Sequence, residues 1–162
     1  MRKIIFSLLP LLSLCEKERE WGGRINLSTG EIEGPVEGEE SSFSLGTTPE
    51  EEREKGKIGW AGFHSHPRGR GGIPEPSGLD WVTAHYRGTS EFVLTSKGIW
   101  EVRPVKVLPV EKVKEIIERG WSWAEAQEEK NGDPAYWYWV SYIRDWLPIE
   151  VNLIWKGGDN KK

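Results

Sequence analysis

The chain has 162 residues, a formal net charge of −4 and 36% apolar residues. This size and composition fit a globular domain with its own core and exclude a wholly disordered chain. The charge and the lack of a dense basic block argue against a nucleic-acid partner. The single cysteine, Cys15, excludes an internal disulfide framework and a cysteine-based zinc cluster. Histidines and carboxylates therefore remain as the available metal ligands.

Residues 1–15 allow two interpretations. The apolar run after Arg2 and Lys3 resembles a signal peptide, and Cys15 stands where a lipoprotein is cleaved and anchored. However, Leu14 is too large for the position before such a cleavage, and the run is too short to cross a bilayer as a helix. We therefore favour a first helix buried in the fold, which predicts a cytoplasmic protein that does not associate with a membrane. Export or lipid anchoring through residues 1–15 is the alternative.

Two strands are predicted after this helix. Residues 20–27 have the composition of a strand, and residues 28–30 form a turn of Ser, Thr and Gly. The return strand covers residues 31–45 and has an irregular middle at Gly34 and Pro35, because proline cannot donate a hydrogen bond to a neighbouring strand.

A short helix is predicted to begin at Thr48. Its sequence combines a capping threonine, a proline in the first turn and a glutamate three residues after the cap, and Gly56 ends it. The acidic residues 50–52 are expected to be solvated and to interact favourably with the helix dipole. Residues 57–63 then predict a strand that runs directly into His64.

Strands and helices continue to alternate in the second half of the chain. This alternation predicts an α/β or α+β fold with a mixed sheet flanked by helices, in a single domain over residues 1–156. The elements expected here are a loop over 67–76, a helix over 77–87, a hairpin over 91–102, helices over 110–130 and 133–147 (the second capped by Asp133), an edge strand over 149–155 and a polar tail over 157–162.

The two C-terminal helices are rich in aromatic residues. We expect Trp121, Trp123 and the aromatic cluster at 136–139 to pack these helices onto the sheet. The alternative is a protein-binding surface or a homodimer interface, because aromatic residues concentrate at interfaces.

The sequences His-Ser-His-Pro at 64–67 and Ser-Gly-Leu-Asp at 77–80 carry the chemistry. Two histidines at positions i and i+2 of an extended segment point the same way, so both imidazoles can reach one ion. Asp80 lies one turn into the following helix, where its carboxylate can point back toward the strand end. Three such ligands, His64, His66 and Asp80, leave a fourth tetrahedral position for water, as in catalytic rather than structural zinc sites.

Simpler interpretations of these residues exist. The histidines could lie in a surface turn, and Ser77 with Asp80 matches a capping box that needs no catalytic role. The capping interpretation does not compete with metal binding, because Ser77 can cap the helix through its backbone while its hydroxyl faces the metal. His85 comes five residues after Asp80 in the same helix and should point aside, so we interpret it as structural.

The pattern resembles the motif of the JAB/MPN (JAMM) metalloproteases, which consists of a distant Glu, His-Ser/Thr-His-Pro and Ser-x-x-Asp. The apolar strand before the histidines, the strand pair at 91–100 and the Glu-x-Gly-Gly sequence at Glu20 are also similar to this family. The resemblance covers residues 2–105, and residues 109–156 form a helical extension outside it. The loop at 67–76 is longer than is usual in the family.

This resemblance implies one catalytic Zn²⁺ held by His64, His66 and Asp80. It implies that Glu20 accepts a proton from the attacking water and later donates it to the leaving amine, and that the Ser77 hydroxyl stabilises the oxyanion. The implied activity is hydrolysis of a peptide or isopeptide bond, with the bond after the C-terminal glycines of a ubiquitin-like protein as the leading substrate. A general endopeptidase, a non-catalytic MPN scaffold that binds a protein partner, and a structural zinc site are the alternatives.

Overall fold

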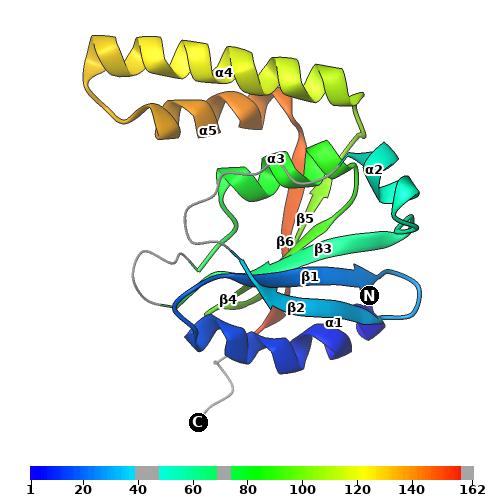
Figure 1. Ribbon diagram of the computed structural model, residues 1–162. Helices are drawn as coiled ribbons and strands as arrows, with labels where there is room; N and C mark the ends of the chain where they lie inside the picture. The colour runs from blue at the N-terminus through cyan, green and yellow to red at the C-terminus, as the bar shows by residue number, and fades with distance from the viewer. Residues whose placement is uncertain (39–47, 69–73, 158–162) are drawn as a thin grey trace.

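A computed structural model of the protein describes residues 1–38, 48–68 and 74–157. These residues form a six-stranded mixed sheet with helices on both faces, which confirms the predicted fold class (Figure 1). The helices are α1 (Arg2–Leu8), the 3₁₀ helix η1 (Leu9–Glu16), α2 (Pro49–Glu54), α3 (Gly78–Arg87), α4 (Val110–Asn131) and α5 (Ala135–Trp146). The strands are β1 (Trp21–Asn26), β2 (Ile32–Glu37), β3 (Trp60–Ser65), β4 (Glu91–Thr95), β5 (Gly98–Pro104) and β6 (Ile149–Lys156).

The strand order across the sheet is β2-β1-β3-β4-β5-β6. β3 and β4 are parallel, and each of the other neighbouring pairs is antiparallel. A parallel pair requires a crossover connection, and α3 provides it. The sheet is strongly twisted, so β1 and β2 run nearly across the direction of β5 and β6 (Figure 1). The crossover places α3 over the sheet immediately after the end of β3.

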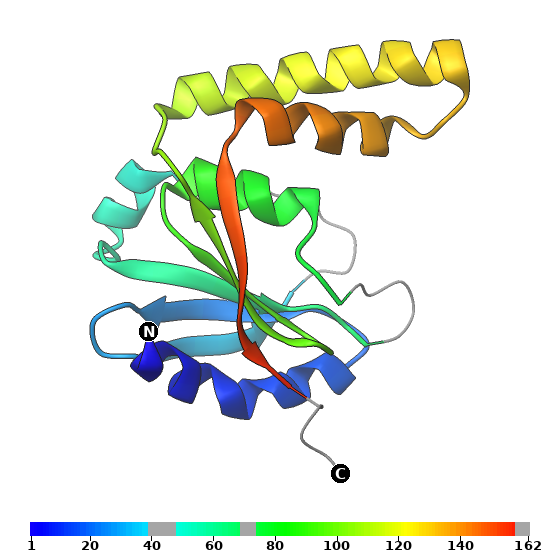
Figure 2. The ribbon, with the colours of Figure 1, turned by 180° about the vertical axis from the view of Figure 1, so that it is seen from behind.

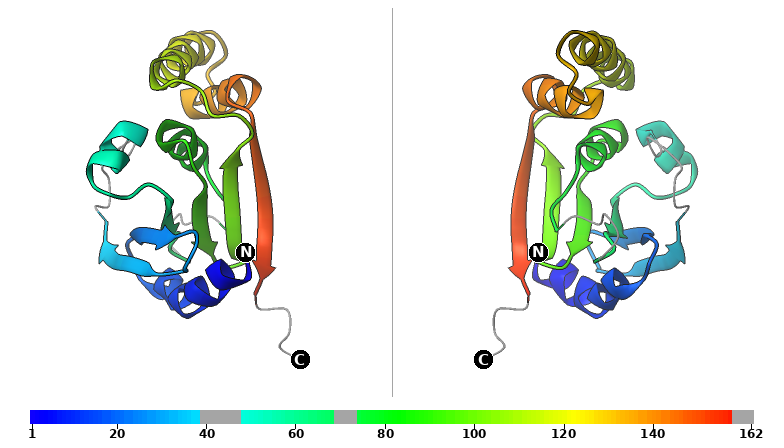
Figure 3. Two further views of the ribbon diagram at one scale, coloured as in Figure 1. Left: turned by 90° about the vertical axis from the view of Figure 1, so that its right-hand side faces the viewer. Right: turned by 90° about the vertical axis from the view of Figure 1, so that its left-hand side faces the viewer.

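The two faces of the sheet carry separate hydrophobic cores. The α1 face is covered by α1 and η1, and the α3 face by α2 and α3 (Figure 3). Buried residues of the α1 face include Ile4, Leu8, Phe63, Phe92, Leu94 and Ile99. Buried residues of the α3 face include Trp81, Val82, Val93, Val102, Trp139 and Ile143. Strand residues alternate between the two cores, as the pleat of a sheet requires.

Residues 2–16 are helical and pack against the α1 face, as the core-helix interpretation expected. The α-helix ends at Leu8 and continues as the 3₁₀ helix η1, because Pro10 cannot supply the N–H that an α-helix needs. The Cys15 side chain is buried, its thiol donates to the Leu94 carbonyl at 3.3 Å, and burial raises the pKa of the thiol to about 11. Within the described ranges, no helix has the length and apolar character needed to cross a bilayer.

The burial of Leu8 makes the contribution of α1 testable. Leu8 is fully buried, whereas Phe6 on the same helix is 69% exposed. We expect Leu8→Ala to lower the free energy of unfolding by about 2–5 kcal/mol, because it removes buried contacts and leaves a cavity. Phe6→Ala should change it by less than about 0.5 kcal/mol. Denaturant unfolding followed by circular dichroism measures both, and equal effects would show that α1 does not pack as described.

α2 has the predicted start, with Thr48 as the capping residue and Pro49 in the first turn. The expectation that residues 50–52 are all solvated is wrong for Glu52, which is 4% exposed. Arg24 of β1 donates to both carboxylate oxygens of Glu52, at 2.9 and 2.6 Å. The reason is the position of α2 over β1, which turns this residue of the helix toward the sheet.

Several strand boundaries differ from the predictions. β2 ends at Glu37 rather than continuing through Gly38, and β5 extends to Pro104 rather than ending at residue 102. β3 spans Trp60–Ser65 rather than residues 57–63, so it includes His64. The N-terminal hairpin, the β4–β5 hairpin and the edge strand β6 are confirmed. Parts of three predicted segments lie outside the described residues, namely 39–45 of the return strand, 69–73 of the long loop and 158–162 of the tail.

α4 and α5 form a hairpin that packs on α3, beyond the sheet rather than directly on it (Figures 1 and 2). Trp139 is fully buried in this hairpin and stacks on Trp121 with ring centroids 4.9 Å apart. The predicted cap Asp133 is not the capping residue of α5. Its carboxylate instead accepts a hydrogen bond from the Tyr138 hydroxyl at 3.1 Å.

Not all the aromatic residues of the hairpin are explained by packing. Trp123, Trp137 and Trp146 are 40%, 65% and 55% exposed, respectively. A protein-binding or homodimer interface at these side chains stays a prediction.

Candidate metal centre

The three predicted ligands come from the end of β3 and the start of α3. His64 is the penultimate residue of β3, and His66 follows the strand. The N–H of His66 donates to the Leu94 carbonyl at 2.8 Å, which extends the β3–β4 pairing and fixes the backbone. Asp80 lies in the first turn of α3. The crossover therefore brings Asp80 back over the two histidines, on the α3 face.

The structure brings the three side chains together. His64 Nε2 lies 3.3 Å from His66 Nε2 and 2.7 Å from Asp80 Oδ1. His66 Nε2 lies 3.3 Å from Asp80 Oδ2. The side chains of His66 and Asp80 are 6% and 7% exposed, and that of His64 is 16% exposed. Solvent can thus approach the group from the side of His64.

Asp80 also has the helix-capping role that the sequence analysis considered. Ser77 is the N-cap residue of α3, and its backbone N–H donates to Asp80 Oδ2 at 2.6 Å. One carboxylate therefore orders the helix start with Oδ2 and faces His64 with Oδ1. This hydrogen bond fixes the rotamer of Asp80 and holds half-buried Ser77 next to the group.

These donors fit a zinc ion. Zinc in proteins binds imidazole nitrogen and carboxylate oxygen at about 2.0–2.2 Å, so two ligand atoms of a tetrahedral site lie roughly 3.3 Å apart. The distances from His66 Nε2 to His64 Nε2 and to Asp80 Oδ2 have this value, 3.3 Å each, whereas His64 Nε2 and Asp80 Oδ1 lie at a hydrogen-bond distance of 2.7 Å. All three ligand atoms lie within 4.8 Å of one another. His64, His66 and Asp80 are therefore the residues that would hold the ion.

The electrostatics of the group favour a bound cation. Burial disfavours the charged form of His64, but the carboxylates of Asp80 and Glu91 outweigh it and raise the pKa of His64 well above its usual value. Burial likewise opposes the charged form of Asp80, but His64 and His66 hold the pKa of the Asp80 carboxyl below its usual range. The three side chains thus strongly favour a positive charge between them. A metal ion can supply this charge in place of a proton.

Glu91 is a residue of the candidate centre that the sequence analysis missed. Its Oε2 lies 2.6 Å from His64 Nδ1, and the residue is 4% exposed. A carboxylate accepts, so Nδ1 of His64 carries a proton. Nε2 faces the Asp80 carboxylate at 2.7 Å, and loss of its proton would free the lone pair of Nε2 for a metal. Metal-binding histidines commonly have such a partner, which fixes the tautomer and orientation of the ring. A glutamate at the first position of the next strand was the only sequence signal for it.

The position of Glu91 is itself fixed. Arg87 Nη1 donates to Glu91 Oε1 at 2.8 Å, so each oxygen of the buried carboxylate has a partner. Gly62 of β3 lies beneath this pair, and a Cβ on Gly62 would come within 2.4 Å of the same oxygen. A side chain at Gly62 would therefore displace the carboxylate that orients His64.

We expect Glu91→Gln to weaken zinc binding by about 10–100-fold, because the neutral amide holds the His64 tautomer less firmly. The substitution keeps the size of the side chain and so limits the loss of packing. Competition with a chelator of known affinity measures the change. Glu101→Gln, which removes a carboxylate that accepts from Ser90 at 2.8 Å instead, is the matched control and should bind zinc as the unsubstituted protein does. Unchanged affinity in Glu91→Gln would remove Glu91 from the site.

Glu20 lies beside the three ligands in the strand register but does not contact them. Gly22 of β1 pairs with His64 of β3, and continuing this antiparallel register sets Glu20 level with His66. The Glu20 side chain is exposed. Among the described residues it has no side-chain hydrogen bond, and its backbone carbonyl accepts from Gly38 at 2.8 Å.

The two glycines after Glu20 have a steric role. A Cβ on Gly22 would lie 2.8 Å from the Phe63 carbonyl oxygen, and one on Gly23 would lie 2.1 Å from the Glu33 carbonyl oxygen. Both glycines thus allow β1 to approach its two neighbouring strands closely. This close approach sets how near Glu20 comes to the end of β3.

His85 has the structural role that the sequence analysis predicted for it. It is 1% exposed, and its Nε2 donates to the Pro148 carbonyl at 2.8 Å. Burial lowers the pKa of His85, which favours the neutral ring. It does not take part in the group formed by His64, His66 and Asp80.

The aromatic hairpin supports the start of α3. Tyr136 of α5 accepts a hydrogen bond from the Gly78 N–H at 3.2 Å, which satisfies one of the free N–H groups at the helix start. A Cβ on Gly78 would come within 2.8 Å of Val140, so only glycine permits this approach. α5 therefore helps to position the turn that carries Asp80.

Comparison of the chain with protein-family models, curated proteins and solved structures gave no match.

Proposed function

We propose that the protein is a zinc-dependent metallopeptidase that hydrolyses a peptide or isopeptide bond. The observation that carries the proposal is the convergence of two imidazoles and one carboxylate within 4.8 Å, at a position that stays partly exposed beside His64. The buried carboxylate of Glu91 behind His64 supports it, because it prepares the ring for a metal. The resemblance of residues 64–67 and 77–80 to the JAB/MPN motif supports the same assignment.

When bound, zinc supplies Lewis-acid activation of water and of a carbonyl group. The chain supplies the proton transfer and the orientation. In this proposal Glu20 takes a proton from the attacking water and delivers it to the leaving amine. The Ser77 hydroxyl donates to the oxyanion that forms at the carbonyl carbon. Asp80 and Glu91 hold the two histidines and the start of α3 in place throughout.

The substrate we propose is a protein or peptide with a bond that follows the C-terminal glycines of a ubiquitin-like protein. To test this, the protein is incubated with ubiquitin-like fusions that carry an extension after Gly-Gly, and the products are identified by mass spectrometry. We expect cleavage after the second glycine, loss of cleavage with a chelator and recovery on adding zinc. Cleavage of unrelated peptides alone would favour a general endopeptidase. A zinc-loaded protein that cleaves neither class would contradict the proposal and favour a binding scaffold.

A further inference from the structure

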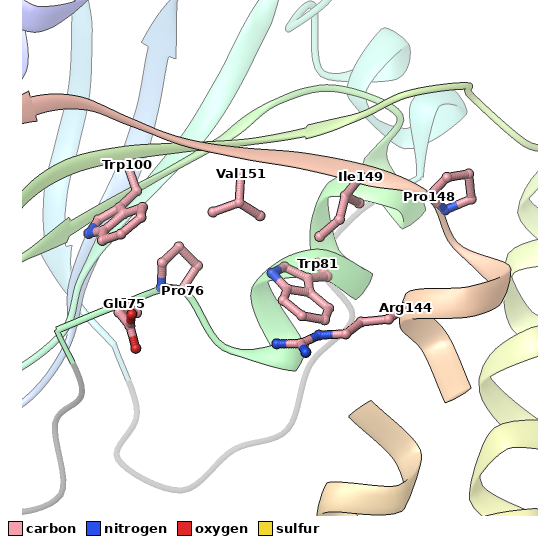
Figure 4. A pocket seen from close by; sticks show the side chains of 8 residues that line it. All are labelled: Glu75, Pro76, Trp81, Trp100, Arg144, Pro148, Ile149 and Val151. Atoms are coloured by element: carbon pink, nitrogen blue, oxygen red, sulfur yellow. The ribbon is translucent and has the colours of Figure 1, made fainter. Parts of the chain in front are cut away.

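A pocket lies beside the candidate metal centre, on the same face of the sheet. It is a cavity of about 560 Å³ between the start of α3, the strands β5 and β6, and α5 (Figure 4). None of the three proposed metal ligands lines it. The lining residues are Glu75, Pro76, Trp81, Trp100, Arg144, Pro148, Ile149 and Val151.

The strand register fixes the distance between the pocket and the metal centre. His64 pairs with Val93, and Val93 pairs with Trp100, so the three residues form one row across β3, β4 and β5. Neighbouring strands lie about 4.8 Å apart, which places Trp100 roughly 10 Å from His64. Trp81 directly follows Asp80 in α3. The pocket is thus a neighbouring site rather than part of the metal centre.

Most of the residues that line the pocket are apolar, and Trp81 adds one unsatisfied polar group. Trp81 is 7% exposed, and its indole Nε1 is buried without a hydrogen-bond partner among the described residues. In Figure 4 this nitrogen lies on the side of the ring that faces Pro76 and Val151 across the cavity. The other indole, Trp100, donates to the Pro74 carbonyl at 3.1 Å and to Thr95 Oγ1 at 3.0 Å. A buried N–H without an acceptor is unfavourable, so a ligand with an acceptor would be favoured.

Arg144 gives the pocket a positive end. Its guanidinium lies 4.6 Å from the centre of the Trp81 ring, and no carboxylate among the described residues forms an ion pair with it. The acidic residue of the pocket, Glu75, pairs instead with Lys97 at 3.8 Å. A guanidinium binds a carboxylate through two parallel hydrogen bonds. The pocket therefore combines two indole walls, one free N–H and one available cation.

We propose that this pocket binds the C-terminal end of a peptide whose last residue is apolar or aromatic. The side chain of that residue lies between Trp81 and Trp100, its α-carboxylate pairs with Arg144, and an acceptor of the same residue receives the Trp81 N–H. This binding uses no metal ligand and does not depend on the proposed hydrolysis.

The test uses the full chain and two small probes, N-acetyl-phenylalanine and N-acetyl-phenylalaninamide, which differ in the carboxylate. We expect calorimetry to show that the acid binds at least about tenfold more tightly than the amide, because only the acid can form an ion-paired hydrogen bond with Arg144. Arg144→Gln should remove this difference. Arg144 is exposed, so the substitution should not disturb folding. Arg103→Gln, which affects an exposed arginine paired with Glu150, is the matched control and should retain the difference.

Two further measurements separate this pocket from the metal centre. The Trp81 indole N–H resonance, identified by its absence in Trp81→Phe, should shift when the acid is added. The affinity for the acid should be the same with zinc, with chelator and in His66→Ala. Equal binding of acid and amide, or full binding by Arg144→Gln, would overturn the proposal. Loss of binding on chelation would place the probe at the metal centre and would also overturn it.

Discussion

His66→Ala should reduce the zinc content of the purified protein from about one ion per chain to less than about one-tenth. The substitution removes one of the three protein ligands. Zinc sites depend on three or four ligands for their affinity, so two ligands alone should hold the ion much more weakly. His66 lies 3.3 Å from both His64 and Asp80, so it closes the ligand triangle. Elemental analysis after gel filtration measures the zinc content, and peptidase activity should disappear with the metal.

The matched control is the remaining histidine. His85 is buried and donates to the Pro148 carbonyl, a role that a glutamine side chain can take over. His85→Gln should therefore retain one zinc ion per chain. Thermal unfolding in the presence of chelator should show that His66→Ala remains folded. A His66→Ala protein with its full zinc content would show that the ligand assignment is wrong.

Glu20→Gln should fold and bind zinc normally but turn over at least ~100-fold more slowly. The loss of a general acid–base typically costs about 10²–10⁴-fold in rate. Metal binding should be unaffected, because Glu20 lies level with His66 in the register but does not belong to the ligand group. Zinc content and the rate of substrate cleavage are measured on the same preparation, so that the two effects can be separated.

Glu18→Gln is the control for Glu20. Glu18 is exposed like Glu20. It precedes Glu20 by two residues and therefore lies further from the start of β1 at Trp21. It should turn over at nearly the rate of the unsubstituted protein. If Glu20→Gln also retained nearly full activity, the general base would have to be sought at Glu16, at Glu18 or among the acidic residues at 31–40.

The parts of the structure that the sequence predicted rest on local signals. The helix starts at Thr48 and Ser77 combine a capping side chain with an acidic residue three positions later, and both are formed within one turn. The spacing of His64 and His66 on an extended segment places both rings on one side, so their convergence also follows from local geometry. Asp80 could be included because the Ser77-Gly78-Leu79-Asp80 sequence predicts a helix start, and one turn into that helix the carboxylate can point back toward the end of the strand.

The parts that were missed depend on contacts between distant segments. Glu91 is next to His64 only because β4 pairs with β3 in parallel, in a register that starts at Gly62 and Glu91. Glu52 is buried only because α2 lies over Arg24 of β1. Neither partner can be read from the neighbouring residues. The pocket beside Trp81 was missed for the same reason, because its walls come from four segments that are distant in the sequence, α3, β5, β6 and α5.

The crossover that unites the ligands also has a consequence for folding kinetics. All three ligands lie between His64 and Asp80, in one short stretch of chain, whereas the pocket is complete only when β6 pairs with β5. Contacts between residues close in sequence form early, because they cost less loop entropy. In refolding from denaturant, zinc uptake should therefore precede closure of the pocket around Trp81. Zinc bound at that stage would stabilise the folding transition state as well as the native state, so it should accelerate refolding and change the unfolding rate little.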